Sequence, residues 1–229
     1  FFGGAGVSTE SGIPDFRSRD GLYNLSYDYP PETILSHSFY LRFPDVFWRF
    51  YREKVLVPAL AAKPNAAHEA LARLEADGHL SAIVTQNIDG LHQKAGSNRV
   101  LELHGSIHRN YCESCHAFYP AEAVLKLLEK DEIPRCTRPG CKGHIKPDVV
   151  LYEEQLNGDI LDAAIESISA AEVMLIGGTS LVVNPAAGLV GLFSGKPLAV
   201  INRDETTSDH NADLLFRENI GRVLGELYR

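Results

Sequence analysis

The sequence lacks any apolar run that approaches the roughly 18 residues needed for a membrane-spanning helix. Its first residues, Phe1-Phe2-Gly3-Gly4, also lack the basic stretch and the apolar core of a secretion signal. We therefore expect a cytoplasmic protein with no membrane partner. Because Phe1 falls inside a predicted first strand, we also expect that a few residues precede it in the full chain.

An excess of positive charge is absent as well. Lysine and arginine total 22 against 30 aspartates and glutamates, so the formal net charge is -8. This balance disfavours nucleic acid as the main partner and favours basic partners such as lysine-bearing proteins. The chain has 229 residues, 45% of them hydrophobic and 23% charged, which suits one globular domain with a small inserted module.

Cysteine is scarce, and its four copies form two close pairs, Cys112-x2-Cys115 and Cys136-x4-Cys141. Each pair can present two thiolates from one tight turn, and two such turns make a closed tetrahedral site. We therefore predict one structural Zn2+ per chain, which would supply folding free energy to a segment too small to bury much core. Free or disulfide-bonded cysteines are the alternative. Three nearby histidines could replace a ligand: His108, His116 and His144.

Short runs rich in valine and isoleucine recur along the chain, each followed at once by small or polar residues. Such runs predict buried parallel strands, and helical patterns over Ala66–Glu75 and Asp159–Ala171 separate some of them. This alternation predicts an α/β fold with a Rossmann-like parallel sheet and helices on both faces. The strands are expected at Phe1–Phe2, Ala82–Val84, Val100–Leu103, Val173–Ile176, Leu198–Ile201 and Asp213–Phe216.

Two stretches depart from this alternation of strands and helices. Residues 21–63 are rich in aromatics and predict packed helices, and residues 107–149 hold the cysteines. We expect this helical insertion and the zinc-binding module to form one smaller domain. Residues 1–20, 64–106 and 150–229 would form the Rossmann-like domain. Ligands of such sheets bind outside the carboxyl ends of the strands, so the polar residues there should converge on one crevice.

A glycine-rich turn, Gly4-Ala5-Gly6-Val7-Ser8, follows the first expected strand. Glycine lets the backbone approach a pyrophosphate, and the N-terminus of a following helix would favour the anion. Thr9 stands where the third glycine of the G-x-G-x-x-G pattern would be, and no acidic residue after a second strand takes the usual ribose-binding place. An ordinary strand-to-helix turn is the alternative explanation.

Several motifs together resemble the catalytic core of bacterial-type sirtuins, a family of NAD-dependent protein deacetylases. They stand in the family's order and cover essentially the whole chain, and the cysteine pairs fall where that family has its zinc. The motifs are Gly4–Ser18 (GAGVSTESGIPDFRS), Thr85–His92 (TQNIDGLH), Leu103–Ser106 (LHGS), Pro147–Val150 (PDVV), Gly178–Leu181 (GTSL) and Ile201–Asn202 (IN).

The resemblance implies a reaction in which NAD is consumed as a co-substrate. The acetyl group of acetyl-lysine passes to ADP-ribose, and nicotinamide and free lysine are released. The resemblance makes His104 the general base, a role that suits imidazole because its ordinary pKa lies near working pH. It makes Asn87 and Asp89 the groups that seat the nicotinamide ribose and carboxamide. Outside this context, these three residues would be ordinary turn, loop or cap residues.

The resemblance also implies cofactor contacts, including a mobile loop, Asp15-Phe16-Arg17. Phe16 would shield the reacting carbon from water, and Arg17 would contact phosphate or position the loop. A solvated surface arginine is the alternative for Arg17. The implied cofactor contacts are Ala5, Gly6, Asp15, Phe16, Arg17, Gln86, Asn87, Ile88, Asp89, Gly178, Thr179, Ser180 and Asn202.

A substrate peptide is expected to add as a strand between two edges of the chain, so that main-chain pairing binds it with little sequence demand. The implied contacts are Val149, Val150, Tyr152, Glu153, Glu154 and Val183. Family members often carry Phe-Gly-Glu where this chain has Tyr152-Glu153-Glu154. The pose of the peptide therefore need not match that of the family.

Sirtuins that remove succinyl or malonyl groups carry a Tyr-x-x-Arg pair, and this chain contains none. We therefore predict that the protein removes acetyl and longer uncharged acyl groups from lysine side chains, with acetyl-lysine-bearing proteins as its partners. We also predict that it is a monomer. A protein mono-ADP-ribosyltransferase is one alternative, although relatives given over to that activity lack the histidine that this chain keeps as His104. A non-catalytic reader of NAD or acyl-lysine and a plain zinc-ribbon interaction protein are the others.

Overall fold

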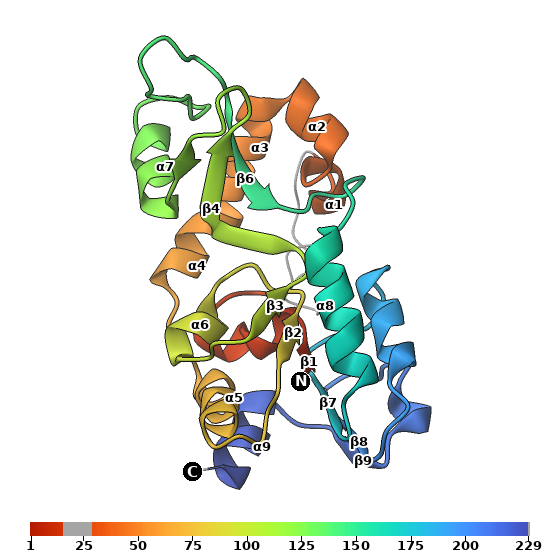
Figure 1. The fold of residues 1–229 in the computed structure, drawn as a ribbon. Coiled ribbons are helices and arrows are strands. Elements are labelled where there is room, and N and C mark those ends of the chain that lie inside the picture. Colours follow the sequence, from red (N-terminus) through yellow and green to blue (C-terminus); the bar gives the residue numbers. More distant parts are fainter. Residues whose placement is uncertain (16–28, 229) are drawn as a thin grey trace.

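The computed structural model describes residues 1–15 and 29–228, and its centre is a six-stranded parallel sheet (Figure 1). The strand order is β3-β2-β1-β7-β8-β9, so the sheet runs outward from β1 in both directions. Ligands of such sheets bind at this switch point, outside the carboxyl ends of the strands. The strands are β1 (Phe2–Gly3), β2 (Ile83–Thr85), β3 (Val100–Glu102), β7 (Met174–Gly177), β8 (Leu198–Ile201) and β9 (Leu214–Phe216).

Alternate residues of the strands face opposite sides of the sheet. Phe2, Val84 and Ile176 belong to one group of buried side chains, whereas Ile83 and Ile201 belong to another. Because both faces are apolar, both must be covered. Helices α8 and η5 cover the first face and helices α5 and α9 the second, which confirms the predicted Rossmann-like sheet. The helices around the sheet are α5 (Ala66–Ala76), α6 (Leu91–Ala95), α8 (Gly158–Ser169), η5 (Ala186–Leu192), η6 (Asp209–Asn211) and α9 (Ile220–Leu227).

Polar side chains and a glycine set the ends of the predicted helices. The side chain of Asn65 accepts a hydrogen bond from the backbone N–H of Ala67 at 3.0 Å, and α5 begins there. Gly78, with a left-handed φ of 77°, follows its last turn. Asn157 caps α8 by accepting from the N–H of Ile160 at 3.1 Å, so this helix begins one residue before the predicted start.

A second group of elements, built from residues 31–61 and 105–149, lies above the sheet in Figure 1 and is called the outer group. Its antiparallel sheet has the strand order β5-β4-β6. The aromatic-rich stretch is helical, as predicted, within its described residues. The elements are α1 (Pro31–Ile34), α2 (His37–Arg42), α3 (Pro44–Phe50), the π-helix η4 (Tyr51–Leu56), α4 (Val57–Ala61), β4 (Gly105–Cys112), β5 (Phe118–Tyr119), α7 (Ala121–Leu128) and β6 (Ile145–Val149).

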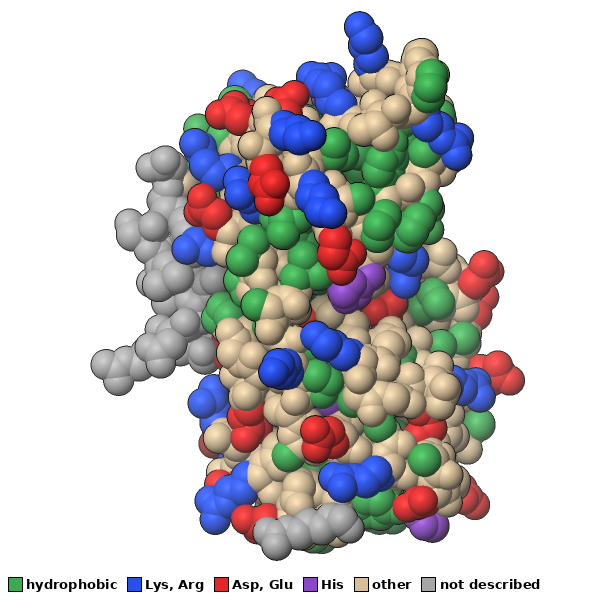
Figure 2. Space-filling model, turned by 90° about the vertical axis from the view of Figure 1, so that its left-hand side faces the viewer, with side chains coloured by type: hydrophobic (Ala, Val, Ile, Leu, Met, Phe, Trp, Pro, Cys, Tyr) green, Lys and Arg blue, Asp and Glu red, His purple; other side chains and the backbone are tan. Residues whose placement is uncertain are grey.

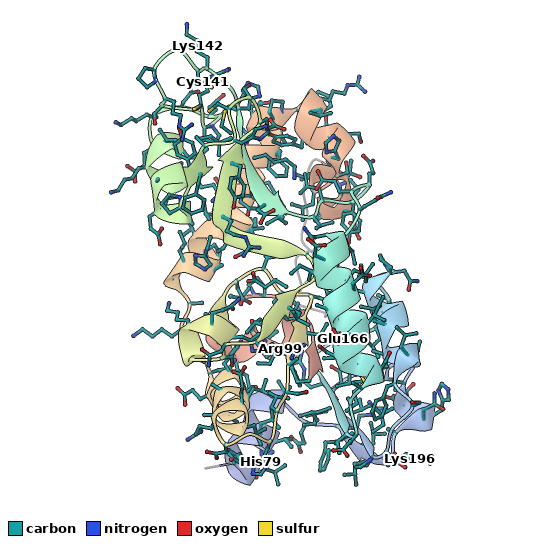
Figure 3. The ribbon with its side chains drawn as sticks, viewed as in Figure 1. His79, Arg99, Cys141, Lys142, Glu166 and Lys196 are labelled. Atoms are coloured by element: carbon teal, nitrogen blue, oxygen red, sulfur yellow. The ribbon has the colours of Figure 1, made fainter. Side chains whose placement is uncertain are left out.

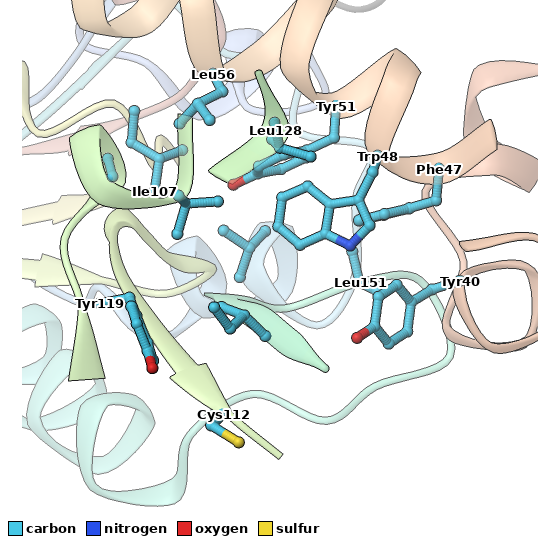
Figure 4. Close-up of a cluster of buried hydrophobic side chains, with 14 of the residues drawn as sticks. Tyr40, Phe47, Trp48, Tyr51, Leu56, Ile107, Cys112, Tyr119, Leu128 and Leu151 are labelled. Atoms are coloured by element: carbon cyan, nitrogen blue, oxygen red, sulfur yellow. The ribbon is translucent and has the colours of Figure 1, made fainter. Parts of the chain in front are cut away.

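The outer group has a hydrophobic core of its own. Trp48 and Tyr51 from the helices pack beside Ile107 of β4 and Leu128 of α7 (Figure 4). Trp48 and Ile107 are completely buried. The rings of Trp48 and Tyr51 meet edge to face with centroids 5.4 Å apart. The aromatic insertion therefore folds against the cysteine-bearing segment, although about 50 residues of chain separate them.

Charged side chains of both signs are interspersed over the face drawn in Figure 2. This is the distribution expected of a surface without a dedicated nucleic-acid footprint on that face. Across residues 1–15 and 29–228, no helix has both the length and the apolar character that a membrane crossing requires.

Candidate active site

A cavity of about 390 Å³ opens where the loops after β1, β2, β7 and β8 meet the outer group. Its size is typical of small-molecule sites, and its position at the switch point is the predicted one. The described residues that the motifs assigned to chemistry, cofactor or peptide all line it: Ala5, Gly6, Asp15, Gln86, Asn87, Ile88, Asp89, His104, Val149, Val150, Tyr152, Glu153, Glu154, Gly178, Thr179, Ser180, Val183 and Asn202. Phe16 and Arg17 lie outside the described residues.

The turn after β1 differs from the expected strand-to-helix turn. Two short 3-10 helices, η1 (Ala5–Val7) and η2 (Thr9–Ser11), follow the strand, so the helix expected after this turn is 3-10 in form and broken into two pieces of three residues. The N–H of Gly6 bonds to the carbonyl of Gly178 at 2.8 Å. A Cβ on Gly6 would lie 2.8 Å from the Cα of Gly178, so glycine is required because two turns touch.

Ser8 joins two of the predicted catalytic residues. Its hydroxyl donates to Oδ2 of Asp89 at 2.7 Å and accepts from the amide of Asn87 at 3.0 Å. Oδ1 of Asp89 accepts from the N–H of Leu91 at 2.9 Å. The side chains of Ser8, Asn87 and Asp89 are buried, and buried polar groups are costly without partners. Ser8 therefore fixes the orientation of both groups, a part that its place in the first motif did not suggest.

His104 is held in a single tautomer by the loop after β2. Its Nδ1 lies 3.0 Å from the carbonyl oxygen of Gln86. Because a carbonyl oxygen can only accept, Nδ1 carries the proton and Nε2 keeps its lone pair. Burial lowers the pKa of His104, and the bond to Gln86 opposes that shift in part. The imidazole is therefore neutral at neutral pH, which is the form that a general base requires.

The loops after β2 and β7 are tied together across β1. The amide of Gln86 donates to the hydroxyl of Thr179 at 3.0 Å, and the same hydroxyl accepts from the N–H of Leu181 at 3.2 Å. Gln86 thus fixes both His104, through its carbonyl, and Thr179, through its side chain. The walls of the cavity on either side of the switch point keep a fixed spacing as a result.

The segment that carries the predicted peptide contacts is anchored to the helical insertion. The N–H of Tyr152 donates to the carbonyl of Leu35 at 3.0 Å, and the carbonyl of Tyr152 accepts from His37 at 3.0 Å. Glu153 has a left-handed φ of 76°, the conformation that glycine would allow without strain. Its carboxylate accepts from both the N–H and the hydroxyl of Ser38, at 2.8 and 2.9 Å. These bonds offset the strain and keep a glycine-like backbone at this position.

The four cysteines converge at the far end of the outer group, where Figure 3 labels Cys141. Their sulfur atoms all lie within 4.8 Å of one another, and the Cys112–Cys141 and Cys115–Cys136 pairs are each 3.6 Å apart. A tetrahedral Zn2+ with Zn–S bonds of 2.3 Å requires sulfurs about 3.8 Å apart. The cluster therefore fits zinc, as predicted, and the cysteines are not disulfide-bonded.

One cysteine of the cluster has a hydrogen-bond donor directed at its sulfur. The hydroxyl of Tyr119 donates to Sγ of Cys136 at 3.2 Å and is itself positioned by the N–H of Thr137 at 2.8 Å. Such donors stabilise and orient a metal-bound thiolate. Of the histidines considered as alternative ligands, His108 lies elsewhere, with Nε2 3.1 Å from the carbonyl oxygen of Asp89.

A doubly wound sheet with its crevice at the switch point defines a Rossmann-like α/β protein. The more specific assignment comes from comparison with known proteins. A sequence model of the Sir2 family matches residues 4–185, and the chain belongs to that family.

Curated relatives span nearly the same length. An NAD-dependent protein deacetylase of Clostridium perfringens is 55% identical, with 99% of this chain and 91% of the relative covered. One of Clostridium acetobutylicum is 54% identical, with coverages of 98% and 90%. Among solved structures, a Sir2–p53 peptide–NAD+ complex is 40% identical with a TM-score of 0.88, and Sir2 bound to an acetylated peptide is 39% identical with a TM-score of 0.87. Both structures cover 99% of this chain and 90% of their own.

Proposed function

We propose that this protein is an NAD-dependent protein-lysine deacetylase, which transfers the acetyl group of acetyl-lysine to ADP-ribose with release of nicotinamide. The observation that carries the proposal is the state of His104. A neutral imidazole with an unprotonated Nε2 lines the same cavity as Asn87, Asp89 and the predicted peptide segment. The relatives named as NAD-dependent protein deacetylases, and the solved complexes with NAD+ and with acetylated peptide, support the same reaction.

In this mechanism His104 is the general base. Its Nε2 removes a proton from a ribose hydroxyl, while the carbonyl of Gln86 holds the Nδ1 proton and steadies the imidazolium that forms. NAD, when bound, would supply an electrophilic anomeric carbon and nicotinamide as the leaving group. Asn87 and Asp89 would hold the nicotinamide ribose and carboxamide through directional hydrogen bonds, and Ser8 fixes the orientation of both side chains.

Other parts of the cavity would hold the rest of the dinucleotide. Ala5 and Gly6 after β1, Gly178 and Ser180 after β7, and Asn202 after β8 all line the cavity. Gly6 and Gly178 touch each other and also line the cavity, so backbone without side chains faces the ligand there, which suits a pyrophosphate. Asp15 belongs to this group, and Phe16 and Arg17 stay predictions.

Val149, Val150 and the segment Tyr152–Glu154, with Val183 opposite, are proposed to bind the substrate peptide as an added strand. The lining of the cavity also includes the apolar side chains of Leu35, Val55, Ala59, Ile88 and Leu151, together with one lysine, Lys54. An apolar wall penalises a buried acyl carboxylate. We therefore expect acetyl-peptide turnover to exceed succinyl-peptide turnover, with longer uncharged acyl groups tolerated. Equal rates on acetyl and succinyl peptides would contradict this.

We also propose a division into two domains. Residues 1–20, 64–106 and 150–229 form the NAD-binding domain, and residues 21–63 with 107–149 form the small domain. The separate hydrophobic clusters of the outer group and of the two faces of the sheet support this division. A monomeric state and a cytoplasmic location stay predictions, to be tested by light scattering and by cell fractionation.

The test compares the wild-type protein with His104→Ala on an acetyl-lysine peptide and NAD, measuring nicotinamide release and the peptide mass. Loss of a general base should lower turnover by about 100- to 10,000-fold, with zinc content and thermal midpoint retained. The exposed His210 provides a matched control as His210→Ala. Undiminished turnover by His104→Ala would overturn the proposal. A stable ADP-ribose adduct on protein, without deacetylated peptide, would favour the mono-ADP-ribosyltransferase.

A further inference from the structure

Strand β4 carries an irregular stretch at the place where the chain leaves the parallel sheet. Ser106 pairs with Asp148 of β6, but the next pairing joins Asn110 to Pro147. Residues 107–109 of β4 therefore stand opposite no residues of β6 and form a bulge. Bulges redirect side chains and are common beside active sites.

Each residue of this bulge makes a contact away from the ladder. The N–H of Ile107 donates to the carbonyl of Ile88 at 3.0 Å, and Nε2 of His108 lies 3.1 Å from the carbonyl oxygen of Asp89. Arg109 makes two ion pairs. Its NH1 lies 2.8 Å from Oε2 of Glu102, and its Nε lies 2.7 Å from Oδ2 of Asp148. The bulge thus joins the Asn87–Asp89 loop, the end of β3 and strand β6.

The two carboxylates that Arg109 pairs flank the reacting residues. Glu102 lies at the end of β3, two residues before His104, and Asp148 lies two residues before Val150. His104 and Val150 are themselves joined, because the carbonyl of His104 accepts from the N–H of Val150 at 3.0 Å. Arg109 therefore joins the end of β3, two residues before His104, to β6, which ends just before Val150.

The environment makes this connection more than a surface ion pair. The side chain of Glu102 is only 8% exposed. The side chains of Arg109 and Asp148 are 40% and 44% exposed, so the buried carboxylate of Glu102 carries the argument. Without Arg109 this carboxylate would lose its compensating charge, and the surroundings would have to move or the carboxyl would have to take up a proton. Gly105 adds a second constraint, because a Cβ there would lie 1.9 Å from the carbonyl oxygen of Asp148. A shift of the backbone at Glu102 would therefore also move His104, two residues further along the chain.

We propose that Arg109 is a positioning residue, which sets the spacing between the base His104 and the acyl-lysine strand at Val150 by pairing Glu102 and Asp148. This inference rests on the proposed deacetylase function. Arg109 is not among the residues that line the active-site cavity, although it lines a second pocket with Glu102 and His108, so we expect it to act on the geometry of the site. Since a displacement of about 1 Å at a reacting group can cost about 100-fold in rate, Arg109→Met should lower kcat by roughly 10- to 100-fold. The KM for NAD should change by no more than about 3-fold, because the dinucleotide contacts are untouched.

The test measures kcat and both KM values for wild type, Arg109→Met, Arg109→Lys and the double variant Arg109→Met/Glu102→Gln. Lysine should restore part of kcat, because its ammonium can still pair Glu102. The double variant should recover at least about 3-fold over Arg109→Met, because it removes the uncompensated carboxylate. Arg222→Met is the matched control: Arg222 also pairs two carboxylates, Glu218 just before α9 and Glu226 within it, but all three side chains are at least half exposed. Thermal midpoint and zinc content check that each variant is folded.

Three results would overturn the assignment of Arg109: a kcat within about 2-fold of wild type for Arg109→Met, an equal loss for Arg222→Met, or no recovery in the double variant. If Arg109→Met fails to fold, the Arg109→Lys variant and the single Glu102→Gln variant decide, and a wild-type kcat in both counts against the proposal. Absence of acetyl-peptide turnover by the wild-type protein would overturn the proposed function and this inference together. Turnover by wild type with any of the three results above overturns only the inference.

Discussion

Two buried histidines should make the fold sensitive to mild acid. His68 on α5 and His92 on α6 are 0% and 1% exposed, and their ring centroids are 4.8 Å apart. Burial, the largest cause, lowers the pKa of His92 to about 3, and the neighbouring His68 lowers it further. Burial likewise lowers the pKa of His68 to about 4, with Asp89 opposing the shift. Both imidazoles are therefore neutral in the folded protein over the whole range from pH 7 to pH 5.

The sign of the effect follows from proton uptake. The unfolded chain binds protons at histidines with the ordinary pKa of about 6.5, while the folded protein does not. Stability is therefore full above about pH 6.5 and falls as the pH drops toward the folded values. Between pH 7 and pH 5 each of the two histidines should cost about 2 kcal/mol, so the pair should lower the free energy of unfolding by roughly 4 kcal/mol.

The variant His92→Leu isolates half of this effect. Both ring nitrogens of His92 are buried without a hydrogen-bond partner in the described part of the chain, so leucine removes polar atoms and breaks no bond. At pH 7 we expect stability to be unchanged or higher. Between pH 7 and pH 5 the loss should shrink to about 2 kcal/mol. Urea titrations at pH 5, 6 and 7, followed by tryptophan fluorescence and circular dichroism, measure both quantities.

The exposed His210 supplies the control, because its imidazole is in contact with water in the folded protein. His210→Gln should leave the dependence of stability on pH as it is in wild type. The reasoning is refuted if His92→Leu shows the same fall in stability between pH 7 and pH 5 as wild type. It is also refuted if His210→Gln abolishes as much of the fall as His92→Leu does.

Three further predictions concern Gly105, at the start of β4, and the zinc cluster. Gly105→Ala should lower the free energy of unfolding by at least about 2 kcal/mol in urea titrations, because Gly105 has a φ of 77° and no room for a Cβ beside Asp148. Gly158→Ala is the control and should not destabilise the fold, because a Cβ on Gly158 would meet no atom within 4 Å. Stripping zinc with a chelator should unfold the outer group, and because the chain has one tryptophan, Trp48, its fluorescence reports this directly. Tyr119→Phe should speed zinc release to a chromogenic chelator several-fold, since the sulfur of Cys136 loses its donor. An unchanged release rate would contradict that role.

Local patterns foresaw the elements of the fold. The strand predicted at Ala82–Val84 lies at Ile83–Thr85, and the helix predicted at Ala66–Glu75 lies at Ala66–Ala76; both predictions needed only the pattern of apolar residues. The zinc cluster followed from cysteine spacing because two tight turns fix thiolate geometry within a few residues. The turn after β1 was missed. Its 3-10 form depends on the bond from Gly6 to the carbonyl of Gly178, which lies 172 residues away in the sequence.

By itself the sequence determined the parallel sheet and the four-cysteine site, because burial periods and ligand spacings act over short stretches. The set of motif residues that line one cavity came from the resemblance to a known family. Only the tertiary structure decided which of those residues contact one another through hydrogen bonds and ion pairs. Ser8 meets Asp89 across 81 residues, and Arg109 reaches Asp148 across 39. Hydrogen bonds and ion pairs act within about 3 Å, and no local pattern records which distant groups the folded chain brings that close.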